Sequence, residues 1–513
     1  MALADMQRNI KHVVHLMLEN RGFDTLLGWL YADGATPAVN HPSLRPGELP
    51  FYGVASGGSE TWQPDDPSFF GNGPYTGGKR MIHRGNWGYC HMPVSDPGEP
   101  WDDVAQQIYG PNRDMNLPAN KRMRGFWLNY QNQPGIGSTD DILATSTPQE
   151  LPVINTLAKG FAVSDMWFAS APTETNPNRA FSLGGSSLGR KVNETFNGVP
   201  FTDLRTIFTV FNENRVGAKI YADHYWKWAS GKYFTEYMFP LGFNTGNLGG
   251  SIAHFQYAVF SDTLPTFSYL EPTFFGEADP TFGTDYHPPG SLYEGEKFLR
   301  RMYDTLRSRP EVFAKTLFIV TFDEHGGTYD HITPPTNAPV PDPLSNDFNR
   351  YGVRVPTLLI SPWVTPGTVF RGPWYPGASN NALPFDHTSV LATLMDWQNI
   401  PYNRVVDRGW LHARTAVAPT FEDVITNVKN TTWPDTQLFD CSTLADPLGA
   451  TKIPRASIPT AVTRITNLPP DDPEHKRIVS HIESVVVTEE QLLAEFRVLM
   501  AKYGDVPRSG CGS

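Results

Sequence analysis

The stretch Thr316-Leu-Phe-Ile-Val-Thr-Phe-Asp-Glu-His-Gly-Gly327 decides the fold of this chain of 513 residues. Its first seven residues are apolar or β-branched without polar alternation, which is typical of a strand buried on both faces of a parallel sheet. Two adjacent carboxylates, Asp323 and Glu324, follow where the strand ends. Ligands of open α/β sheets bind beyond the carboxyl ends of the strands, so the same stretch predicts a functional site.

Other short apolar runs indicate further strands of the same sheet. They are β-rich, end in polar residues, and lie at 12–18, 161–163, 218–221 and 355–360. Helical patterns lie between them, including one over 292–309 just before the strand at 316–322. This alternation predicts an α/β fold with a doubly wound, mostly parallel sheet flanked by helices.

The rest of the chain divides by composition. We predict a catalytic domain over residues 1–415 with loop-rich insertions at about 30–150 and 222–260, where Gly, Pro, Asn and aromatic residues are frequent and periodicity is weak. We expect a C-terminal extension, 416–513, to pack on that domain. It is extended in character to about residue 475, and a helix is predicted near 488–503, beginning with the capping-box pair Thr488 and Gln491.

Bulk properties exclude several function classes. The net charge of −12 gives no footprint for nucleic acid. Three cysteines, Cys90, Cys441 and Cys511, form neither a disulfide framework nor a thiolate metal site. No apolar run is long enough for a transmembrane segment. The N-terminus lacks a signal-peptide pattern, so we expect a cytoplasmic protein, or a secreted or periplasmic one if an export signal was removed.

The carboxylates at the strand ends predict a metal site. Adjacent carboxylates such as Asp323 and Glu324 repel each other and need a compensating cation. Oxygen ligands select hard divalent cations such as Ca²⁺, Mg²⁺ or Mn²⁺, and the two glycines that follow let the backbone approach a ligand. Glu19 and Asn20, directly after the first strand, offer two more oxygen donors. The alternative for that pair is a strand-to-turn junction with a helix cap.

Thr175-Asn-Pro-Asn-Arg179 predicts the start of a helix, because Pro177 suits a first helical turn. Thr175 then lies beside free N–H groups that favour an anion. Next to a metal, its hydroxyl could lose a proton and attack phosphorus. The alternative is that Thr175 only caps the helix.

Four histidines are further candidates. His287 and His325 could each donate to a phosphoryl oxygen or protonate a leaving group, or could be structural. His387 opens a predicted helix and is expected to be a neighbour of its cap. His331 is expected to orient its own loop.

Together these motifs, in this order, resemble the phosphoesterase family of phospholipases C and an acid phosphatase, within the alkaline-phosphatase-like superfamily. The resemblance extends over about residues 9–400. It depends on six short motifs: Glu19-Asn-Arg21 with Phe23-Asp24, Thr175-x-Pro-Asn-Arg179, Leu264–Pro272, Asp285-x-His287-Pro-Pro289, Asp323–His331 and Phe385–Ser389.

The resemblance implies an alkaline-phosphatase-like fold and metal-dependent hydrolysis of a small-molecule or phospholipid phosphoester. Thr175 would be the nucleophile and form a phosphothreonine intermediate, and His287 and His325 would assist the phosphoryl or leaving group. One divalent metal ion, expected to be Ca²⁺, Mg²⁺ or Mn²⁺, would be bound by Glu19, Asn20, Thr175, Asp323 and Glu324.

The chain departs from the family pattern at two positions. Gly22 replaces the usual Ser, and Glu99 stands in Asp96-Pro-Gly-Glu-Pro-Trp101 where a His is expected. A carboxyl at 99 would change leaving-group protonation or the preferred substrate charge. We predict that Glu99, Arg179 and the nearby His91 contact the substrate.

Two other functions remain open. Thr175-x-Pro-x-Arg179 has the spacing of a sulfatase motif, but Thr cannot become formylglycine, so a sulfatase-like ester hydrolase is the weaker reading. The Glu99 departure also leaves open a metal-binding protein with altered or lost activity. The sequence does not choose between phosphate monoesters and diesters.

Overall fold

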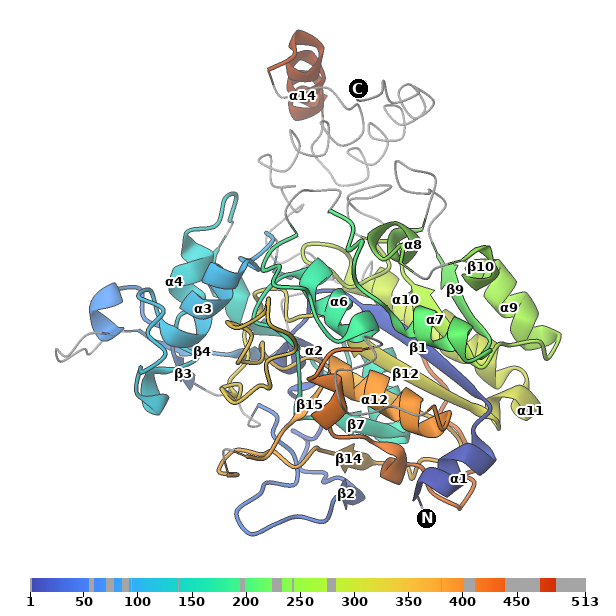
Figure 1. The fold of residues 1–513 in the computed structure, drawn as a ribbon. Coiled ribbons are helices and arrows are strands. Elements are labelled where there is room, and N and C mark those ends of the chain that lie inside the picture. Colours follow the sequence, from blue (N-terminus) through green and yellow to red (C-terminus); the bar gives the residue numbers. More distant parts are fainter. Residues whose placement is uncertain are drawn as a thin grey trace.

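The computed structural model describes residues 2–54, 60–70, 78–84, 92–93, 95–136, 138–193, 199–223, 233–241, 244–274, 283–379, 381–400, 411–438 and 471–485. Within these ranges, nine strands form one central sheet (Figure 1). Their order across the sheet is β10 (Leu248–Ser251), β9 (Ala218–Ala222), β11 (Phe267–Glu271), β1 (His12–Leu18), β12 (Thr316–Phe322), β13 (Thr357–Ile360), β7 (Ala162–Ser164), β14 (Thr368–Phe370) and β2 (Val39–His41).

Most neighbouring strands in this sheet are parallel, which confirms the predicted fold class. The exceptions are the pairs made by β13, which is antiparallel to both β12 and β7. The run at 355–360 was grouped with the parallel strands, and that direction is wrong. A strand buried on both faces has the same apolar composition in either direction, so its sequence carries no sign of orientation.

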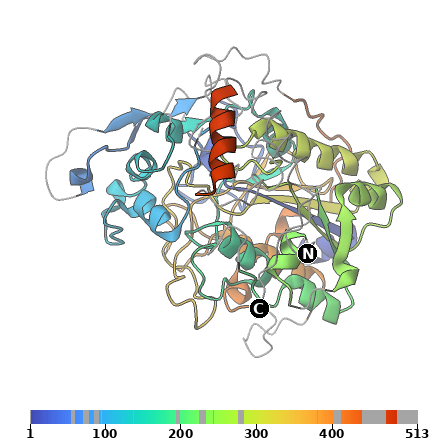
Figure 2. The ribbon, with the colours of Figure 1, turned by 90° about the horizontal axis from the view of Figure 1, so that it is seen from above.

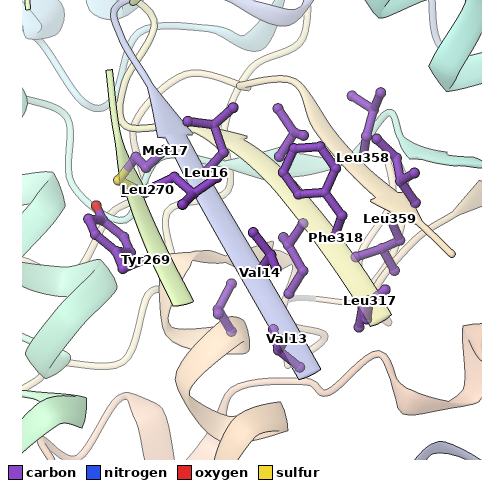
Figure 3. Close-up of a cluster of buried hydrophobic side chains, with 14 of the residues drawn as sticks. Val13, Val14, Leu16, Met17, Tyr269, Leu270, Leu317, Phe318, Leu358 and Leu359 are labelled. Carbon is purple, nitrogen blue, oxygen red and sulfur yellow. The ribbon is translucent and has the colours of Figure 1, made fainter. Parts of the chain in front are cut away.

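The strands form because their side chains are buried on both faces. Every residue of β12 is buried, and so are six of the seven in β1. Figure 3 shows side chains of β11, β1, β12 and β13 in one hydrophobic cluster, with Leu16, Tyr269 and Phe318 among them. Each such side chain contributes about 1.5–3 kcal/mol when it leaves water, so this cluster fixes the sheet.

Helices cover both faces of the sheet (Figure 2). On one face α6 (Thr175–Gly184) packs against α12 (His387–Trp397) and α7 (Ile207–Glu213), and on the other α10 (Leu292–Arg307) packs against α5 (Pro152–Gly160). The remaining helices described outside the lobe below are α1 (Ala2–Asn9), α2 (Phe23–Leu27), α8 (Phe234–Met238), α9 (Ile252–Phe260), α11 (Pro310–Phe313) and α14 (Pro473–Val485).

The two segments predicted as insertions also supply edge strands of the sheet, β2 and β10. These strands have three and four residues, too few to show a periodic pattern. Residues 60–145 form a lobe beside the sheet (Figure 1), with α3 (Trp101–Tyr109), α4 (Phe126–Gln131), β3 (Glu60–Trp62), β4 (Lys79–Met81), β5 (His83–Arg84) and β6 (Ala144–Thr145). A further two-stranded sheet pairs β8 (Trp167–Phe168) with β15 (Phe385–Asp386).

The described part of the chain after residue 410 first runs back onto the sheet and its helices. Phe421, Val424 and Ile425 are buried in the main core, and the Tyr303 hydroxyl donates to the Pro434 carbonyl (2.9 Å). Helix α14 begins at Pro473, within sequence that we expected to be extended, and the helix predicted near 488–503 lies outside the described residues. Among the described helices, none combines the length and hydropathy that crossing a bilayer requires.

Candidate active site

Two adjacent strand ends assemble the centre of the site. β1 and β12 are parallel and in register to their last residues, so Glu19-Asn20 and Asp323-Glu324 leave the sheet at the same edge. The Asn20 backbone N–H donates to Asp323 Oδ1 (3.0 Å), and the Glu324 N–H donates to the same oxygen (2.8 Å). Asn20 has a φ of 55°, a conformation that non-glycine residues seldom adopt. The backbone therefore holds the two pairs together.

Gly326 lets this junction close. Its φ is 61°, and a Cβ at this position would lie 2.1 Å from the Asn20 carbonyl oxygen. Its N–H donates to Glu324 Oε2 (2.7 Å). The glycine that follows the two carboxylates is therefore required by the close approach of two loops, as the sequence predicted.

We expect Gly326→Ala to lower the free energy of unfolding by at least about 3 kcal/mol, because it adds a backbone clash to an unfavourable left-handed φ. Gly34→Ala is the matched control: its φ is 85°, but a Cβ there meets nothing within 4 Å. That control should cost only about 1 kcal/mol. Urea denaturation of both variants tests the difference, and equal losses would contradict the packing argument.

Thr175 begins α6 and faces the strand ends. Its Oγ1 lies 3.1 Å from Glu19 Oε2 and 3.3 Å from Asn20 Oδ1, and its one proton is donated towards these two acceptors. The N-cap residue of α6 is Glu174, and no side chain caps the helix. The Thr175 hydroxyl therefore belongs to the site, and the reading in which it only caps the helix does not hold.

The buried charges at the site do not balance. Burial raises the pKa of Glu19 and of Asp323, and the charge of Asp323 raises the Glu19 pKa further. Burial and Asp323 likewise raise the pKa of Glu324. The buried guanidinium of Arg179 donates from Nε to Glu19 Oε1 (2.8 Å) and lies 3.5 Å from Asp323 Oδ2. Three carboxylates against one guanidinium leave two negative charges in excess.

The donor set fits a hard divalent cation. Asp323 Oδ2 and Glu324 Oε1 are buried, and neither has a hydrogen-bond partner within the described residues. A buried carboxylate oxygen without a partner is costly, and a dication would both neutralise the excess charge and satisfy these oxygens. The oxygen donors that the structure gathers here are those of Glu19, Asn20, Thr175, Asp323 and Glu324.

Glu99 and His287 approach Asn20 from the solvent side. Asn20 Nδ2 donates to Glu99 Oε1 (2.5 Å) and to His287 Nε2 (2.8 Å). His287 Nδ1 lies 2.6 Å from the Pro288 carbonyl oxygen and donates to it, which leaves Nε2 as the acceptor. The exposed fraction of the side chain rises from 0% at Asp323 to 13% at Glu99 and 16% at His287. A substrate would therefore reach Thr175 from this side.

Two of the predicted site residues have other surroundings than expected. His325 is buried, with Nε2 2.8 Å from Gln107 Oε1 and Nδ1 3.2 Å from Glu324 Oε2. Burial lowers its pKa to about 3, so it holds Glu324 as a neutral ring and does not face a leaving group. Arg179 is fully buried and paired with Glu19, so the prediction that it contacts substrate is wrong.

The remaining histidines agree with the expectations for them or lie outside the described residues. His387 Nε2 donates to the Asp323 carbonyl (2.5 Å), next to the Asp386 cap of α12. His331 contacts Asp24 at 2.5 Å and so orients its loop. His91 lies outside the described residues.

Sequence reasoning missed Gln107, which connects the lobe to the site. Its Nε2 donates to the Gly98 carbonyl (2.6 Å) while its Oε1 contacts His325. The only signal in the sequence was a polar residue on the buried face of an amphipathic helix. Two other clusters of potential metal ligands occur among the described residues, Asp96–Glu99–His287 and Asp24–Asp330–His331. In the second, Arg354 pairs with both aspartates, so that cluster is already charge-balanced in part.

Comparison with known proteins places this geometry among phosphoester-cleaving enzymes. The model of the Phosphoesterase family matches residues 10–401. Non-specific phospholipase C1 of Arabidopsis thaliana is 31% identical over 425 residues, which are 81% of this chain and 71% of that protein. Non-specific phospholipase C4 of the same plant is 31% identical over 86% of this chain and 75% of its own length. Phospholipase C A of Mycobacterium tuberculosis is 26% identical over 77% of this chain and 74% of its own length.

Solved structures are more distant. A protein in the alkaline phosphatase superfamily from Vibrio parahaemolyticus aligns over 54% of this chain and 63% of that chain, with 11% identity and a TM-score of 0.30. At that level the fold is argued from the strand order above.

Proposed function

The chain belongs to the Phosphoesterase family and is a phosphoric ester hydrolase, and from this premise we propose that Thr175 attacks the phosphorus of the ester. We further propose that a divalent cation assists, bound by Glu19, Asn20, Thr175, Asp323 and Glu324. The charge balance carries the proposal: three buried carboxylates surround the Thr175 hydroxyl, and one buried guanidinium compensates only one of them.

The chain's own groups provide the proton transfers. Thr175 Oγ1 forms the new bond to phosphorus as the bond to the leaving oxygen breaks. Its proton passes to the Glu19 carboxylate, which already lies 3.1 Å away. His287, on the solvent side, is placed to protonate the leaving oxygen, and water then hydrolyses the phosphothreonine. The bound cation would lower the pKa of the hydroxyl and offset the charge that develops on the phosphoryl oxygens.

Charge on the solvent side favours a phosphodiester over a phosphomonoester. Glu99 lies close enough to Asp96, Glu324 and Glu174 for each of them, after burial, to raise its pKa. These carboxylates repel a monoester dianion more strongly than a diester monoanion. The phospholipase C relatives, whose names denote cleavage of a phospholipid diester, support the same choice.

A substrate panel on metal-defined protein tests the function. We expect chelated protein to be inactive, and a hard divalent cation to restore turnover. We expect kcat/KM for an aryl phosphodiester to exceed that for the corresponding monoester by at least about 10-fold. An aryl sulfate should show no turnover. Full activity after chelation would overturn the role of the cation, and a preference for the monoester would overturn the substrate class.

A further inference from the structure

We propose that Glu99 is a positioning residue that fixes the side-chain amide of Asn20, with Asn20 Oδ1 turned towards Thr175. The inference rests on the proposed function in one respect, the role of Asn20 as a ligand of the cation. It explains why a carboxyl can stand at a position that does not need to touch the reacting phosphorus. Nothing in the family resemblance assigns this role to residue 99.

The hydrogen bonds of Asn20 leave its side chain one orientation. Its Nδ2 donates to Glu99 Oε1 (2.5 Å) and to His287 Nε2 (2.8 Å), while its Oδ1 lies 3.3 Å from Thr175 Oγ1. A flipped amide would set Oδ1 against two acceptors and turn the NH₂ group towards the cation ligands. Both contacts would be repulsive, so the two acceptors on the solvent side select the productive orientation.

Glu99 is itself held by the lobe and by the glycine loop. The Gly98 carbonyl accepts from Gln107 Nε2 (2.6 Å). A Cβ at Gly98 would lie 2.5 Å from Gln133 Nε2, and a Cβ at Gly327 would lie 2.6 Å from the Gly98 oxygen. The backbone before Glu99 is therefore packed on both sides. The lobe reaches the nucleophile through one chain of contacts, from Gln107 through Glu99 to Asn20 and Thr175.

The positioning role requires an acceptor at residue 99 and no negative charge. Gln keeps an acceptor oxygen at the same distance from the backbone, whereas Leu keeps only the bulk. A role in which the carboxylate attracts a cationic substrate group, or protonates the leaving oxygen, needs the acid itself. Glu99→Gln and Glu99→Leu therefore separate positioning from both other roles.

The experiment measures Mn²⁺ affinity by calorimetry, and kcat and KM on an aryl phosphodiester, for both variants. We expect Glu99→Leu to weaken Mn²⁺ binding by about 10- to 100-fold, the range seen when a group orienting a metal ligand is lost, and to lower kcat with little change in KM. We expect Glu99→Gln to stay within about 3-fold of the wild type in all three quantities. Asp102→Asn is the control, because Asp102 is 73% exposed and pairs with Arg113 away from Asn20.

Three results would overturn the positioning role. One is a Glu99→Gln variant as impaired as Glu99→Leu, which would show that the charge or the proton acts directly. This comparison remains decisive even if Glu99→Leu fails to fold. Another is unchanged Mn²⁺ affinity in a folded Glu99→Leu. The third is a binding stoichiometry that falls from two to one in Glu99→Leu, which would make Asp96–Glu99–His287 a cation site. A wild type that binds no Mn²⁺ would instead refute the proposed function.

Discussion

Thr175→Ala is expected to lower kcat on a phosphodiester by about 10,000-fold or more, because it removes the oxygen that attacks phosphorus. The fold should survive. Thr175 is the first residue of α6 and does not cap it, and its hydroxyl bonds only within the site. Loss of that bond should cost about 1–2 kcal/mol of stability. Circular dichroism and urea denaturation check the fold, and steady-state kinetics check the rate.

Thr175→Ser is the matched control for this prediction. It keeps the hydroxyl and removes one methyl group, so its kcat should lie far above that of the alanine variant. Acid quenching of the wild type during turnover, followed by peptide mass spectrometry, should locate a phosphoryl group on residue 175. Turnover of Thr175→Ala within 10-fold of the wild type would exclude Thr175 as the nucleophile.

The sequence predicted best those elements whose physics is local. Strands β1 and β12 begin and end at the residues expected, because each is a seven-residue run that is buried almost throughout. The residues that follow them were predicted to share a site because parallel strands end at one edge of a sheet. Glu19, Asn20 and Asp323 indeed lie in hydrogen-bond contact with one another or with Thr175.

The sequence could not predict which polar groups pair across the fold. Arg179 and Glu19 are 160 residues apart, and their pairing depends on how α6 packs over β1. His325 was left open between a catalytic and a structural role, and only the position of Gln107 decides it. The antiparallel direction of β13 is a similar case, because it is set by its partners and not by its own residues. Such features are properties of contacts and have no signature in a single segment.

Asp323→Asn is expected to abolish stabilisation by divalent cations and to lower kcat by at least about 1,000-fold, while the cation-free protein becomes no less stable. Asn keeps the Oδ1 that accepts from the Asn20 and Glu324 N–H groups. Its NH₂ group replaces Asp323 Oδ2, which has no hydrogen-bond partner within the described residues, and removes one of the three crowded negative charges. The loss of the weak 3.5 Å contact with Arg179 is offset by that relief.

The pH dependence of stability gives this prediction a sign. Burial and the Asp323 charge raise the pKa of Glu324, and burial raises the pKa of Glu19. A carboxyl whose pKa rises on folding holds its proton more tightly in the folded state. Cation-free stability is therefore greatest below the ordinary carboxyl pKa and decreases as the pH rises towards neutral. Asp323→Asn should flatten this decrease, because it removes a charge that raises the pKa of its neighbours.

Urea denaturation of the cation-free wild type and of Asp323→Asn, at pH 5 and pH 8, measures the effect. Asp96→Asn is the control, because Asp96 is 50% exposed and lies outside the buried set of carboxylates. It should leave the slope with pH nearly unchanged. A wild type that gains stability between pH 5 and pH 8 without cations would contradict the excess of buried negative charge. The cation would then have no electrostatic reason to bind at the ends of β1 and β12.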